Sequence, residues 1–186
     1  PTKESIEAER QKVMNEVAWS REYLLKIVAP EDQIIKPEWI QYYDDLPDMT
    51  FNTFFATGID LAISQEQNAD KTAMVSAQIQ GRYSQDMKIY IMPNVVNKHL
   101  TSLASITMAK AVSDSFSRRG MLFIENNGYQ QSFVEHLKSA HYPAEGVRSV
   151  GDKYSRLNMV SFLIESGTVL FPKQGAEELR MQLLGF

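Results

Sequence analysis

The chain has 186 residues, a net charge of −4 and a pI of about 5.4, and it is 44% hydrophobic and 23% charged. This composition is typical of one globular domain with room for a small appended segment, and it excludes an intrinsically disordered chain. Because the sequence contains no cysteine, disulfides, thiolate chemistry and cysteine-ligated zinc are excluded.

The negative net charge argues against a protein that binds nucleic acid strongly by itself, because such proteins are usually basic. Any nucleic-acid role would need a local basic patch, a bound cation or another domain. No apolar run approaches the roughly 20 residues of a membrane span. The charged N-terminal segment lacks the apolar core of a signal peptide. We therefore expect a cytoplasmic protein with no membrane role.

Residues 1–50 are predicted to form a helical linker segment. Over residues 1–29 the apolar positions recur on one helical face, until Pro30 ends the pattern; these positions are Ile6, Val13, Val17 and Leu24. The following proline-rich and acidic stretch indicates a connector with one short helix around residues 38–43. We place a domain boundary near residue 50.

The hydrophobic period changes after this boundary. Residues 54–63 read as a buried strand, residues 72–80 alternate as a half-buried strand, and residues 87–93 form a third strand that stops at Pro93. Because short connections join these strands, we expect an antiparallel meander.

The rest of the chain alternates between helices and strands. Residues 121–125 form a short apolar run that is typical of a strand covered on both faces. The other expected elements are helices over 101–118, 129–140, 154–166 and 175–186, a strand over 168–172, and a short strand around Val147, with Gly167 as a C-cap. The order predicts an α/β fold, in which helices cover both faces of a mixed sheet.

Two acidic residues, Asp60 and Glu125, belong to apolar strand segments. If the first and fourth strands of the domain are neighbours, both carboxylates emerge near the same edge of the sheet. Like charges held so close need a cation between them or raise each other's pKa. Oxygen ligands favour Mg²⁺ or Mn²⁺, and carboxylate-bound metal pairs are used by many nucleases. The alternative is that each acid is simply a capping or turn residue.

Four stretches closely resemble the nuclease domain of tailed-bacteriophage terminase large subunits. They are TGIDLAISQEQNADKTAMV, LFIENNGYQQSFVEHLK, GDKYSRLNMVSFLIESGTVLFP and ELRMQLLGF. The upstream segment WSREYLLKIVAPEDQIIKPEWIQYYDDLP resembles the region that joins the ATPase and nuclease domains of that family. The resemblance covers nearly the whole chain from about Trp19, and the motifs occur in the family's order.

The resemblance implies a ribonuclease-H-like fold with a five-stranded mixed sheet, and a metal-dependent endonuclease that cuts concatemeric viral DNA. Asp60 matches the family's first catalytic acid, in a GIDxA-type motif, and Glu125 matches the second, in an IE-type motif. Both would be metal ligands, in a site that holds two Mg²⁺ or Mn²⁺ ions when complete. Asp70, in a D-x-TA pattern, would add a contact near the metal, or is a plain turn residue.

Other residues have both a functional and a structural interpretation. The resemblance makes Lys153 and Arg156 contacts to the DNA backbone or the rim of the site. Asp152 could lie near the metal, or could cap the following helix. Tyr129 could line the cleft, beside a turn that fixes Glu125.

The resemblance also implies a longer protein. The family's third catalytic acid lies just downstream of a QLLGF-like segment, and this chain ends at Phe186, so we expect a nuclease domain, residues 51–186, that is truncated at its C-terminus. No GxxxxGK[ST] loop occurs, so the ATPase domain would be elsewhere in the full-length chain. The implied partners are double-stranded DNA, the portal protein and the small terminase subunit. The implied location is the host cell cytoplasm, transiently at the procapsid.

Two alternatives remain open at this point. One is another ribonuclease-H-like nuclease, such as a Holliday-junction resolvase. A preference for four-way junctions over linear duplex would support it. The other is a non-catalytic docking module for the portal or the ATPase domain.

Overall fold

The computed structural model describes residues 33–62, 71–82, 84–126 and 130–186. The helix predicted over residues 1–29 lies outside these ranges. Within them, every helix is too short or too polar to span a lipid bilayer.

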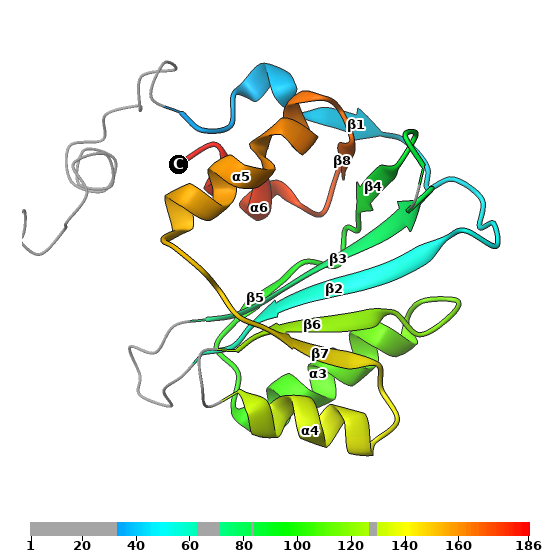
Figure 1. Cartoon of the computed structure of the whole chain (residues 1–186), viewed down its shortest axis with the longest axis vertical. Helices are drawn as coiled ribbons and strands as arrows, with labels where there is room; N and C mark the ends of the chain where they lie inside the picture. The colour runs from blue at the N-terminus through cyan, green and yellow to red at the C-terminus, as the bar shows by residue number, and fades with distance from the viewer. Residues whose placement is uncertain (1–32, 63–70, 83, 127–129) are drawn as a thin grey trace, which may run out of the picture.

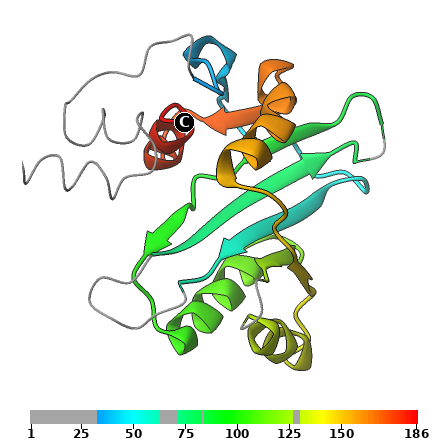
Figure 2. The ribbon, with the colours of Figure 1, turned by 60° about the vertical axis from the view of Figure 1, so that its left-hand side comes forward.

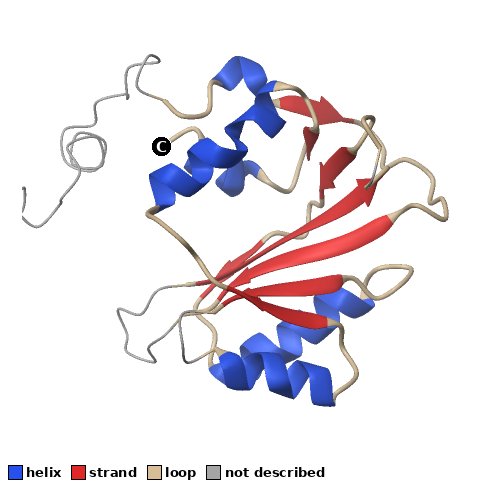
Figure 3. Ribbon diagram, in the orientation of Figure 1, coloured by secondary structure: helices blue, strands red, loops and turns tan. Residues whose placement is uncertain are grey.

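The described residues form one mixed sheet with helices on both faces (Figure 1, Figure 3). The strands are β1 (Gln41–Tyr43), β2 (Phe54–Asp60), β3 (Thr72–Gln80), β4 (Lys88–Ile91), β5 (Val96–Lys98), β6 (Met121–Glu125), β7 (Ala144–Val147) and β8 (Val169–Pro172). The helices are the 3₁₀ turn η2 (Pro37–Trp39), α3 (Ser102–Asp114), α4 (Gln131–Ser139), α5 (Lys153–Glu165) and α6 (Glu177–Leu183).

The strand order is β1-β8-β4-β3-β2-β6-β7, and β5 pairs with β3. The predicted meander is confirmed, because β2, β3 and β4 pair antiparallel. The predicted neighbourhood of the first and fourth strands is also confirmed, since β2 and β6 pair in parallel. The five strands from β4 to β7 form the expected ribonuclease-H-like sheet, which β8, β1 and β5 extend to eight strands.

Alternation along β2 assigns the two faces of the sheet. Phe55 and Ile59 belong to a core cluster with residues of α3 and α4, so these helices cover that face. The alternate residues, among them Gly58 and Asp60, point to the opposite face. That face carries the second cluster, which includes residues of α5 and α6. Figure 2 shows the two helix pairs on opposite sides of the strands.

The chain before residue 50 contributes to the second cluster. The short helix predicted around residues 38–43 is wrong, because η2 ends at Trp39 and residues 41–43 form β1, which pairs in parallel with β8. The boundary near residue 50 stays a prediction. Ile35, which is 0% exposed, packs in the same cluster as Phe171 of β8.

We expect Ile35→Ala to lower the free energy of unfolding by about 2–5 kcal/mol, because it removes a fully buried side chain. Met49→Ala, at an exposed residue of the same region, should stay within about 0.5 kcal/mol of wild type. Urea denaturation of the three proteins measures both values. Equal stability of all three would contradict the packing of residues 33–43 against the sheet.

Candidate metal centre

The site lies where three parallel strands end. Ile59 of β2 pairs with Ile124 of β6, so the next residues along each strand are Asp60 and Glu125. β7 pairs in parallel with β6 and ends beside them at Val147. Figure 1 shows the carboxyl ends of β2, β6 and β7 meeting at one side of the sheet. In α/β sheets, ligands bind at such carboxyl ends.

The structure explains why the apolar run of β2 ends in an acidic residue, Asp60. The strand was predicted over residues 54–63, but it ends at Asp60. The carboxylate is therefore at the rim of the sheet, on the face opposite α3 and α4, and not within the hydrophobic core. The expected proximity of Asp60 and Glu125 is confirmed, because they follow paired residues of β2 and β6 and line the same cavity.

The electrostatics of Asp60 reflect this crowding. Burial raises the pKa of its carboxyl group above the ordinary value, and the charge of Glu125 raises it further. The positive charges of Lys153 and Arg156 lower it in part. A divalent cation bound between two carboxylates held this close would remove their mutual repulsion.

Glu125 has two further partners on its Oε1 atom. The Ser149 hydroxyl donates a hydrogen bond to it. The Arg156 guanidinium donates another over 3.3 Å. Both partners come from the segment after β7, in which Gly151 has a φ of 81° that permits the turn into α5. This turn brings the first turn of α5 over the ends of β2 and β6.

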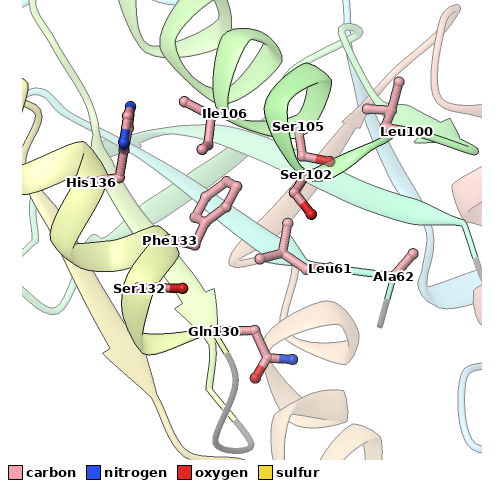
Figure 4. A pocket seen from close by; sticks show the side chains of 10 residues that line it. All are labelled: Leu61, Ala62, Leu100, Ser102, Ser105, Ile106, Gln130, Ser132, Phe133 and His136. Carbon is pink, nitrogen blue, oxygen red and sulfur yellow. The ribbon is translucent and has the colours of Figure 1, made fainter. Parts of the chain in front are cut away.

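These groups line one open cavity of about 380 Å³. Its walls include Asp60, Glu125, Ser149 and Arg156, and its apolar floor comes from neighbouring strands. A larger cavity of about 690 Å³ lies on the other face, between the end of β2 and the helices α3 and α4. Figure 4 shows that its lining is apolar apart from serine hydroxyls, the Gln130 amide and the His136 imidazole, and that it contains no carboxylate. Because cation chemistry needs acidic oxygens, the smaller cavity is the candidate site.

Asp152 is the N-cap of α5. Its carboxylate accepts hydrogen bonds from the Ser155 backbone N–H at 3.0 Å and the Ser155 hydroxyl at 2.8 Å. These bonds hold the pKa of Asp152 below its ordinary value. Of the two interpretations, the structure supports the helix cap. Within the described ranges, no group of three or more histidine and acidic side chains could hold a metal ion.

We expect Asp152→Ala to lower the melting temperature, because it removes the cap of α5. Asp152→Ser should restore most of it, since serine also caps helices. Differential scanning fluorimetry measures both changes. If Asp152→Ser behaved like Asp152→Ala in stability and also lost Mn²⁺ binding, Asp152 would be a metal ligand instead.

The structure describes only some of the other predicted site residues. Asp70 and Tyr129 lie outside the described residues, so their roles stay predictions. Lys153 and Arg156 lie close enough to Asp60 for their positive charges to lower its pKa. Ser149 was not predicted, because an isolated serine after a short strand carries no pattern that would single it out.

Comparisons with known proteins give a consistent result at the level of structure. No protein-family model and no curated protein matches the sequence. The nuclease domain of the phage P22 large terminase matches with a TM-score of 0.55 at 14% identity, over 82% of this chain and 78% of that domain. The large terminase nuclease of thermophilic phage G20c, with bound magnesium, matches with a TM-score of 0.52 at 12% identity, over 76% of this chain and 75% of that one.

A third match extends along nearly the whole chain. The large terminase of a second thermophilic bacteriophage matches with a TM-score of 0.56 at 11% identity, over 97% of this chain. The matched region is 43% of that terminase, so the chain spans less than half of that relative's length. The chain has the ribonuclease-H-like fold of phage large-terminase nuclease domains.

Proposed function

We propose that this chain is a divalent-metal-dependent DNA endonuclease of a viral genome-packaging motor. The proposal rests mainly on the two acidic residues, Asp60 and Glu125, which lie at the ends of adjacent parallel strands and line the same cavity. They occur in a fold shared with phage terminase nucleases. Fold alone does not specify chemistry, so the acid pair supplies the argument for activity.

The donor set fits a hard cation. Mg²⁺ usually binds through one or two carboxylates, several waters and substrate phosphates, and this site offers two carboxylates that border an open cavity. The nuclease of phage G20c has been solved with magnesium, zinc and cobalt. We propose Mg²⁺ or Mn²⁺ here, with two ions in the complete site. When bound, such ions activate water and stabilise the leaving oxygen of a phosphodiester.

The protein groups have separate roles in this proposal. Asp60 and Glu125 hold the cation, and the Ser149 hydroxyl fixes the orientation of the Glu125 carboxylate. Ligand carboxylates in metal sites are commonly held by such hydrogen bonds. Lys153 and Arg156, at the start of α5, contact phosphates of the DNA backbone. Contacts of this kind position the duplex without reading its sequence, so cutting should have low sequence specificity.

The partners follow from the same proposal. The match to the large terminase of the second thermophilic phage includes only part of that protein, which supports an ATPase domain in the same full-length chain. Double-stranded DNA is the substrate, and the portal protein and small terminase subunit are the proposed assembly partners. The enzyme would act in the host cell cytoplasm, transiently at the procapsid.

The proposal is tested by incubating the purified chain with linear duplex, supercoiled plasmid and a four-way junction, in Mn²⁺ or in EDTA. We expect cleavage of the first two in Mn²⁺ and none in EDTA. A strong preference for the junction would favour a resolvase instead. No cleavage of any substrate, together with no binding of Mn²⁺, would favour a docking module.

A further inference from the structure

Arg156 occupies the site itself. Its Nη1 atom lies 3.3 Å from Oε1 of Glu125, and its side chain is 31% exposed, against 23% for Glu125. Both residues line the cavity that contains Asp60. The guanidinium is therefore inside the cavity that substrate would enter, and it already has a carboxylate partner there.

The ion pair between Arg156 and Glu125 has the geometry of an exchangeable contact. Strong guanidinium–carboxylate pairs are usually bidentate, with N···O distances of about 2.7–2.9 Å. The hydrogen bond from Arg156 to Glu125, at 3.3 Å, is longer than this. Ion pairs that are partly open to solvent also contribute little to stability. The pair is therefore weak enough to be replaced if another cation engages Glu125.

A divalent cation and the guanidinium make competing demands on Glu125. Two positive charges within a few ångströms of one oxygen repel each other, and the effect is largest in a partly desolvated site. Arg156 comes from the first turn of α5, and a long flexible side chain at a helix start can change direction without moving the helix. The planar guanidinium matches phosphate as well as it matches carboxylate.

We propose that Arg156 exchanges partners during the reaction cycle. It pairs with Glu125 when the carboxylates hold no divalent cation, and it binds a substrate phosphate once they do. This inference rests on the proposed function and deepens it, because it couples cation binding to DNA binding through one side chain. Such coupling is reciprocal, so DNA must strengthen cation binding by the same factor.

The first test is cation binding without DNA, for which Mn²⁺ is the probe. Arg156→Gln keeps a polar side chain but removes the charge, so we expect Mn²⁺ to bind about threefold to tenfold more tightly by calorimetry. Arg156→Lys keeps the charge and should resemble wild type. Arg118→Gln is the matched control, because Arg118 bonds to the Thr50 carbonyl, near the start of β2 and away from Asp60.

The second test is DNA binding, measured by fluorescence anisotropy of a labelled duplex in EDTA and in Ca²⁺. We expect Ca²⁺ to increase the DNA affinity of wild type by at least about threefold more than that of Arg156→Gln. In EDTA, where Arg156 is paired with Glu125, the two proteins should bind DNA alike. A gel confirms that the duplex stays intact, and thermal melting confirms that each variant is folded.

Two results would overturn the proposal while leaving the nuclease intact. Weaker Mn²⁺ binding by Arg156→Gln would make Arg156 a support that positions Glu125. An unchanged gain of DNA affinity on adding Ca²⁺ to Arg156→Gln would show that Arg156 does not transfer to phosphate. A wild-type chain that binds no Mn²⁺ would refute the metal site, and the exchange with it, so the two failures are distinguishable.

Discussion

Replacing Asp60 with asparagine is expected to reduce Mn²⁺-dependent DNA cleavage by at least about a hundredfold, since metal ligation stabilises the transition state by several kcal/mol. Asparagine has nearly the same shape as aspartate, but it removes one of the two negative charges that would hold the cation. Plasmid cleavage followed over time, with wild type and variant at equal concentration, measures the effect. Equal cleavage by both proteins would place the chemistry away from Asp60.

The same variant carries its own control for folding. Burial raises the pKa of Asp60 in the folded chain, so its contribution to stability is present at low pH and is lost as the pH rises through that raised value. Asparagine cannot ionise, so the variant does not lose this stability at neutral pH. Without divalent metal, Asp60→Asn should therefore melt at the wild-type temperature or above it. A lower melting temperature would mean that lost activity reflects lost structure.

Replacing Phe171 with alanine is expected to lower the free energy of unfolding by about 3–5 kcal/mol. Phe171 is 1% exposed, lies on β8 between β1 and β4, and packs with Ile35, Ile40 and Ile164. Its removal leaves a cavity in the cluster that supports α5, the helix that carries Arg156. Urea denaturation followed by circular dichroism measures the change.

Phe162→Ala is the matched control for Phe171→Ala. Phe162 belongs to α5, but it is 58% exposed, so its truncation should change stability by about 0.5 kcal/mol or less. If Phe171→Ala cost less than about 1 kcal/mol, far below the usual range for a buried phenylalanine, the second cluster would not be part of the cooperative core. Similar losses from both variants would contradict the burial pattern of α5 and β8.

The sequence predicts the central part of the fold well because its signals are local. Residues 72–80 place Ala73, Val75, Ala77 and Ile79 on one face, and they form β3 with the same bounds. The opposite face, with Thr72, Met74, Ser76 and Gln78, is the more buried. The run over residues 121–125 is apolar throughout until its final acid, and it forms β6 between two other strands. α5 ends with Ser166 as its C-cap, and the next residue, Gly167, has the positive φ of 66° that is common just after a helix.

The short strands β1 and β5 could not be predicted from a local sequence pattern. β1 and β5 each contain three residues, too few to show a period. β1 pairs with β8 near the other end of the chain, and β5 pairs with β3, with the strand β4 between them in the sequence. The sequence therefore indicated a helix for residues 41–43, where tertiary pairing decides the conformation.

The residues of the candidate site also differ in whether a local sequence pattern reveals them. Asp60 and Glu125 could be found because each belongs to an apolar run, but the neighbourhood of their strands was only a condition in the sequence analysis, and the pairing of β2 with β6 shows it. Ser149 could not be found, because its role depends on the turn at Gly151 and on the position of Glu125. The ion pair of Arg156 also depends on where α5 crosses the sheet, which no local pattern encodes.

Calorimetric titration of the chain with Mn²⁺ shows whether Asp60 and Glu125 together hold a divalent cation, and it needs neither DNA nor turnover. Wild type and Asp152→Ser should bind Mn²⁺, whereas Asp60→Asn and Glu125→Gln should each lose most of the binding heat. Loss in both acid variants would establish that Asp60 and Glu125 hold one divalent-metal site. Undiminished binding by either acid variant, or no binding by wild type, would contradict it.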